Sequence, residues 1–219
     1  AIGTNALDAG TTITDSVAIG RDSLTATTVN RNTAAGYAAM RGTTTGTGTA
    51  LGYAALLSNT TGTANVAIGG GTSTQDSALR DNTTGSNNTA VGVASLANNT
   101  TASFNNAVGY QALYSNTTGS DLVGVGSAAL YNNTTGTRNV AFGNNALNAV
   151  TTGTNNTGLG DRALRDNTGS NNTAVGSDAL LVNTTGTLNT AVGSFVLDAN
   201  VTGIENTAVG YASLSANTG

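Results

Sequence analysis

The chain has 219 residues, 7 of them basic and 11 acidic, with a formal net charge of −4. Histidine and cysteine are absent, which removes the common catalytic bases, nucleophile pairs and zinc ligands. Without a basic stripe or an apolar run of about 18 residues, we expect neither nucleic-acid binding nor membrane insertion in this segment.

From its first residues the chain repeats one unit, whose marker is a glycine preceded by an apolar residue. Successive markers are 16 or 17 residues apart, except for a gap of 23 between Gly69 and Gly92. The markers are Gly3, Gly20, Gly36, Gly52, Gly69, Gly92, Gly109, Gly126, Gly143, Gly160, Gly176, Gly193 and Gly210. So short a period is typical of a stacked solenoid, whereas a disordered Gly/Ser/Thr/Asn-rich chain would not keep its apolar residues in phase.

Within one repeat the residues predict two short strands and two turns. Residues 88–91, Asn-Thr-Ala-Val, predict a strand, Gly92 a bend, and residues 94–96, Ala-Ser-Leu, a second strand. Residues 116–119, Asn-Thr-Thr-Gly, predict a turn with positive φ at Gly119. The fold class is therefore all-β, a parallel β-solenoid of about thirteen coils of 16–17 residues, with like side chains stacked above one another.

The interior of one coil is thin, with one large aliphatic residue, one leucine and two alanines. If residues 94–96 form a regular strand, its alanine and leucine point to opposite sides, and a row of alanines is left for a partner chain to cover. We therefore expect obligate association of identical chains into a rod, with three-fold symmetry favoured and other cyclic orders open.

Residues 1–219 form a single repeat array, which we interpret as a segment of a longer fibre protein. The long gap contains a six-residue insertion within residues 70–77. Such a loop can be a contact site or simply a tolerated insertion, and the second interpretation is favoured.

No motif in the chain predicts chemistry, so no catalytic, cofactor-binding or metal-binding residue is expected and the chain is not predicted to be an enzyme. The acidic residues are scattered and form no repeated calcium cage. Arg80–Asp81 and Arg165–Asp166 occupy matching positions and predict solvated surface pairs. Sequons such as Asn99-Thr100-Thr101 predict turn residues rather than glycosylation sites.

One ladder suggests another function. Thr-Gly-Thr or Thr-Gly-Ser recurs at residues 45–47, 61–63, 84–86, 118–120, 135–137, 152–154, 168–170 and 185–187. Rows of threonine on a flat solenoid face are used by several ice-binding proteins. The glycine inside each pair favours a turn instead of a flat strand.

The repeats at residues 106–113 and 206–214 resemble the head repeats of trimeric autotransporter adhesins, and residues 16–20, Ser-Val-Ala-Ile-Gly, are the closest single match. The same residue pattern also resembles repeats of phage tail fibres and large bacterial surface proteins. The resemblance covers the whole chain and implies a left-handed parallel β-roll, assembled as a trimer on a bacterial cell or virion surface and used for attachment. The period here is longer than in those head repeats.

These observations predict a structural or adhesive segment of an extracellular surface fibre. Its partners would be identical chains and a host-cell or prey-cell surface or matrix. An ice-binding solenoid and the shaft of a phage tail fibre are the alternatives.

Overall fold

The computed structural model describes residues 1–8 and 13–219, which divide into two compact units, Ala1–Thr118 and Gly119–Gly219. Both units are parallel β-solenoids, with about eleven turns in all, and no α-helix occurs among the described residues. The prediction of an all-β parallel β-solenoid is therefore confirmed.

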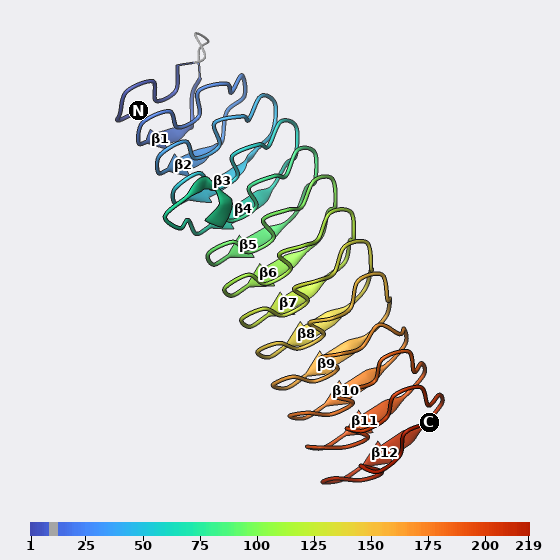
Figure 1. Ribbon diagram of the computed structural model, residues 1–219. Coiled ribbons are helices and arrows are strands. Elements are labelled where there is room, and N and C mark those ends of the chain that lie inside the picture. The colour runs from blue at the N-terminus through green and yellow to red at the C-terminus, as the bar shows by residue number, and fades with distance from the viewer. Residues whose placement is uncertain (9–12) are drawn as a thin grey trace. The chain divides into compact units, whose positions relative to one another are not determined.

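The strands of the solenoid are three or four residues long. In the first unit these are β1 (Val17–Ile19), β2 (Thr33–Ala35), β3 (Gly48–Leu51), β4 (Asn65–Ile68), β5 (Thr89–Val91) and β6 (Asn106–Val108). In the second they are β7 (Val123–Val125), β8 (Val140–Phe142), β9 (Thr157–Leu159), β10 (Thr173–Val175), β11 (Thr190–Val192) and β12 (Thr207–Val209). Within each unit every strand pairs in parallel with the next in the chain, so the strands lie side by side in sequence order (Figure 1).

The register of these pairs places like residues together. Val175 of β10 is opposite Val192 of β11, and Ala174 is opposite Ala191. A strand residue therefore meets its counterpart in the neighbouring repeat, as the fixed period predicts.

The prediction of a second strand at residues 94–96 is wrong. Ala94 and Leu96 have φ of 56° and 51°, in the left-handed region, and the segment is a turn. This geometry directs the amide of Leu96 along the stack, where it donates to the carbonyl of Ala112 in the next repeat at 2.9 Å. The bonds between repeats therefore offset a backbone strain of about 1–2 kcal/mol per left-handed residue.

This turn also changes which side chains face the interior, compared with the sequence prediction. The leucine and the preceding alanine both lie in the interior, as Leu113 and Ala112 show with no exposed surface. The strand alanines, such as Ala107, are buried as well. The large aliphatic residue before the marker glycine points outward instead, because a three-residue strand with its middle residue inside must direct its first and third residues to the other face.

Two kinds of glycine shape each turn, and only the marker has positive φ. Gly92 has φ of +131°, and a Cβ there would lie 2.5 Å from the carbonyl oxygen of Gly109. The predicted positive φ at Gly119 is wrong, because among the glycines that the structure describes only the thirteen markers have positive φ. Its counterpart Gly85 is required for space instead, since a Cβ would lie 2.5 Å from Oδ1 of Asn82.

Buried asparagines form two ladders inside each unit. In the first unit, Nδ2 of Asn82 donates to Oδ1 of Asn59 at 2.8 Å, and Nδ2 of Asn99 donates to Oδ1 of Asn82 at 2.8 Å. In the other ladder Oδ1 of Asn65 accepts the backbone amide of Asn88 at 3.0 Å. These side chains have no exposed surface, and they satisfy backbone groups at the turns that have no partner in the sheet.

The long repeat in the first unit carries a short 3-10 helix, η1 (Thr74–Asp76), in an excursion beside β3 and β4 (Figure 1). Ser77 Oγ donates to the carbonyl of Tyr53 at 2.8 Å, and the guanidinium of Arg80 donates to the carbonyl of Gln75 at 3.0 Å. The inserted residues are thus held against the solenoid by hydrogen bonds.

Candidate interaction surface

The outward face of the strands is the most distinctive surface of the chain. We call it the strand face and define it as the first and third residues of the pairing triplet in each strand, on either side of the buried middle residue. Its members are Val17, Ile19, Thr33, Ala35, Thr49, Leu51, Val66, Ile68, Thr89, Val91, Asn106 and Val108 in the first unit, and Val123, Val125, Val140, Phe142, Thr157, Leu159, Thr173, Val175, Thr190, Val192, Thr207 and Val209 in the second. None of these residues is charged.

The third-position residues of the strand face are apolar, all of them except Ala35 are large, and most are substantially exposed. Ile19 is 44% exposed in the first unit, and in the second Phe142 and Leu159 are 57% and 37% exposed. A continuous apolar stripe of this kind is unusual on a surface that faces only water. In the second unit the first-position residues Thr157, Thr173, Thr190 and Thr207 form a threonine row beside the apolar row, whereas in the first unit threonine is interspersed with other residues.

The predicted surface pairs Arg80–Asp81 and Arg165–Asp166 both form. In each, the guanidinium Nε and Nη2 donate to the two carboxylate oxygens of the adjacent aspartate. These hydrogen bonds raise the pKa of Arg80 and of Arg165, against a lowering by burial. Arg80 is less solvated than expected, because its side chain is only 11% exposed and also donates to Asn98 and to Gln75.

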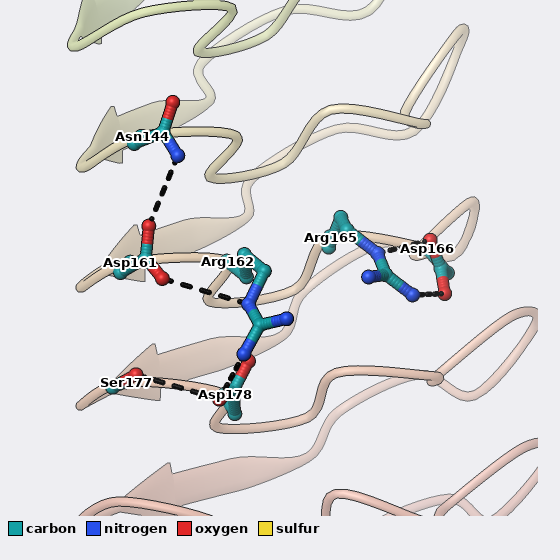
Figure 2. Close-up of polar contacts among 7 residues, drawn as sticks. All are labelled: Asn144, Asp161, Arg162, Arg165, Asp166, Ser177 and Asp178. Carbon is teal, nitrogen blue, oxygen red and sulfur yellow. Dashed lines mark hydrogen bonds and ion pairs between the residues drawn. The ribbon is translucent and has the colours of Figure 1, made fainter.

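A second charged contact was missed at the sequence level. Nη2 of Arg162 donates to Oδ2 of Asp178 at 2.7 Å, and Nε of Arg162 lies 3.5 Å from Asp161 (Figure 2). The Asp178 side chain is only 2% exposed. Arg162 and Asp178 each stand two residues after a marker glycine, so alignment of the repeats places them one above the other. That alignment is the signal that could have predicted this pair.

The threonine ladder of the Thr-Gly-Thr segments lies in bends outside the strands. Part of its hydroxyl array bonds neighbouring repeats, since Oγ of Ser86 accepts the amide of Thr63 at 3.0 Å and Oγ of Ser170 accepts that of Thr154 at 2.9 Å. The sequon residue Asn99 is buried in a ladder. Its interpretation as a turn residue agrees with this position.

A search of the described residues finds no group of three or more acidic, histidine or cysteine residues placed to hold a metal ion. No helix in the same residues is long and apolar enough to cross a membrane. No family model matches the sequence, and no curated protein or solved structure is significantly similar to it. Functional inference therefore depends on the surfaces of the chain itself.

Proposed function

We propose that this chain is a non-enzymatic, structural or adhesive segment of an extracellular surface fibre, built by association of identical chains through the strand face. The thirteen marked repeats each form one coil of the array. The fibre projects from a bacterial cell or virion surface and attaches to a host-cell or prey-cell surface or matrix. Repeated weak contacts along such a fibre add up by avidity.

The exposed aliphatic row of the strand face carries this proposal. In both units hydroxyl groups at the turns are bonded between repeats and buried asparagines are paired, yet Ile19, Phe142 and Leu159 are left in contact with water. Burying such a row stabilises an assembly by about 25 cal/mol per Å² of apolar surface. An identical chain offers a row with the same period, so its residues can meet repeat by repeat.

The sequence predicted that chains would associate through rows of alanine. Those alanines are buried inside the chain itself, so the strand face takes their place as the proposed surface of association. Cyclic symmetry gives every chain the same environment, and three-fold symmetry about an axis parallel to the stack remains the favoured order. The resemblance to trimeric autotransporter head repeats supports this order and implies the left-handed sense of the coil.

The native mass of the purified chain tests the proposal, and light scattering after size exclusion measures it. We expect three times the mass of one chain. Val192→Asp places a charge on the strand face and is expected to reduce the mass. Thr185→Asp, on an exposed turn of the same repeat, is the matched control and should leave the mass unchanged. A folded wild-type chain that stays monomeric at every concentration would refute association, and equal effects of the two variants would refute the role of the strand face.

Ice binding remains a second candidate because of one observation, the threonine row on the strand face at Thr157, Thr173, Thr190 and Thr207. This row lies on regular strands, unlike the Thr-Gly-Thr segments. Thermal hysteresis of the purified chain tests it, and Thr173→Val is expected to change the hysteresis only if the row binds ice. A phage tail-fibre shaft would use the same association and differ in where the fibre is mounted.

A further inference from the structure

A surface groove with a volume of about 410 Å³ lies in the first unit, where the turns meet β3 and β4. Its walls are formed by Arg31, Thr47, Gly48, Thr49, Ala64, Asn65 and Val66. Arg31, Thr47 and Ala64 stand at the same position of three successive repeats, as the pairing of Gly48 with Asn65 and the bond from Gly48 N to Oδ1 of Asn32 establish. The groove exists because Thr47 and Ala64 are short next to the long side chain of Arg31.

The charge in this groove is a single guanidinium. Arg31 is exposed and makes no ion pair with any residue in the described part of the chain. None of the lining residues is acidic. The nearest acid in the row is Asp15, one repeat before Arg31, which does not pair with it here.

Hydroxyl groups and an apolar wall accompany the guanidinium. Oγ1 of Thr47 accepts the amide of Ala64 at 3.2 Å and keeps its proton to donate. Thr49 and Val66 are outward-facing residues of β3 and β4, half-exposed beside the groove. The groove therefore combines one fixed positive charge, two hydroxyls and an aliphatic surface.

We propose that this groove binds a carboxylated sugar of the uronic-acid class. The guanidinium of Arg31 receives the carboxylate, because an arginine fork matches the two carboxylate oxygens. The hydroxyls of Thr47 and Thr49 bond the sugar hydroxyls, and Val66 packs against the C–H surface of the ring. Thr49 and Val66 also belong to the strand face, so we expect glucuronate binding and association of chains to compete at these two residues.

The second unit provides a matched control. Arg138 occupies the same position of its repeat as Arg31, with φ of 56° against 69°. There Nε donates to Oδ1 of Asn155 at 2.8 Å. Arg138→Gln therefore removes an equivalent charge outside the groove.

Saturation-transfer NMR with glucuronate, glucose and acetate as separate probes tests the proposal on the full chain. Glucuronate is expected to bind with a Kd of about 1 mM, as suits a small ligand in an open groove. Glucose lacks the carboxylate and acetate lacks the hydroxyls, so both should bind at least about tenfold more weakly. Added salt should weaken glucuronate binding, because the pair is exposed to solvent.

Variants locate the site. Arg31→Gln is expected to weaken glucuronate binding at least about tenfold, and Arg138→Gln to leave it unchanged. Ala64→Asn should weaken binding by filling the groove, and it suits the backbone because asparagine holds this position with positive φ at Asn87 and Asn155. Asp15→Asn should strengthen binding modestly, because it removes a negative charge one repeat away that repels the sugar carboxylate.

Absence of glucuronate binding by the Val192→Asp variant, in which the strand face is expected to be open, would overturn the proposal. Equal binding of glucose or acetate, or equal effects of the two arginine variants, would also overturn it. The native mass is measured on the same samples. A monomeric wild-type chain that binds glucuronate through Arg31 would refute association while supporting this site. A Val192→Asp variant of reduced mass that does not bind glucuronate would support association through the strand face and refute this site.

Discussion

The asparagine ladder gives the sharpest test of what holds one repeat to the next. Asn99 has no exposed surface and makes three side-chain bonds. Its Nδ2 donates to Oδ1 of Asn82 at 2.8 Å and to the carbonyl of Ala102 at 3.0 Å, and its Oδ1 accepts Nδ2 of Asn116 at 3.0 Å. Asn99→Ala removes all three.

The magnitude follows from which groups lose a partner. The Ala102 carbonyl still accepts a hydrogen bond from Nδ2 of Asn88 at 2.9 Å, so it is not left without a donor. Oδ1 of Asn82 and Nδ2 of Asn116 each lose one buried hydrogen-bond partner, and each loss costs about 1–3 kcal/mol of stability. We expect Asn99→Ala to lower the free energy of unfolding by about 3–5 kcal/mol. The adjacent Asn98→Ala removes one acceptor of Arg80 at a half-exposed site and should cost under about 1 kcal/mol.

Asn99→Asp sharpens the test, because it keeps the shape and replaces the amide donor by a carboxylate. Burial raises the pKa of the introduced carboxyl above its unfolded value of about 3.9. The native state then binds more protons than the unfolded state between the two values, so stability falls as the pH rises through this window. The loss relative to wild type is expected to be greatest at neutral pH and to shrink in acid, whereas the loss in Asn99→Ala stays constant.

Urea denaturation followed by circular dichroism at neutral and acidic pH measures these differences. Hydrogen exchange over residues 82–116 shows whether the loss is local, as expected when each repeat contacts only its neighbours. Equal costs for Asn99→Ala and Asn98→Ala, or a loss in Asn99→Asp that does not change with pH, would contradict a ladder of buried amides.

Two further substitutions test the turns and the charged contacts. Gly92→Ala forces a Cβ to within 2.5 Å of the Gly109 carbonyl oxygen and should cost at least about 3 kcal/mol, whereas Gly52→Ala, with the same φ of +131° and its nearest atom at 2.9 Å, should cost less. Thermal unfolding ranks the pair, and equal costs would show that space is not the constraint. Asp178→Asn breaks a pair whose carboxylate is 2% exposed and should cost about 1–3 kcal/mol, against under about 1 kcal/mol for Asp166→Asn at a site 36% exposed. The opposite order in urea denaturation would refute this explanation.

The features that repeat directly could be predicted from the sequence. A fixed spacing of marker glycines requires that like residues stack, which predicts the parallel register of Val175 with Val192 and the leucine column inside each unit. It also predicts stacked asparagines at the turns, as Asn82 and Asn99 form them. The same alignment contains the Arg162–Asp178 pair, since a charge in one repeat meets whatever occupies that position in the next.

The conformation of residues 94–96 could not be predicted, because local propensity and the solenoid favour different backbones. Alanine and leucine rarely adopt positive φ on their own, and here they do so because amides directed along the stack find carbonyls in the next repeat. Such bonds appear only once the repeats are stacked. The groove beside Arg31 is equally hidden from the sequence, because it arises from the lengths of three side chains brought together by the register.

Two residues of each repeat face the opposite way from the sequence prediction, and this difference bears on the proposed association of chains. Once the left-handed turn brings Leu113 and Ala112 into the interior, the space left opposite the strand fits only a small residue, and alanine takes it at Ala107. The bulky Val108 must then face outward, 39% exposed, in a row that the chain itself does not cover. Leucine and alanine thus fill the narrow interior, and the bulky residues of the strand face are left exposed to solvent. This exposed row is why we propose that the strand face packs against a surface with the same period, which another copy of the chain would offer.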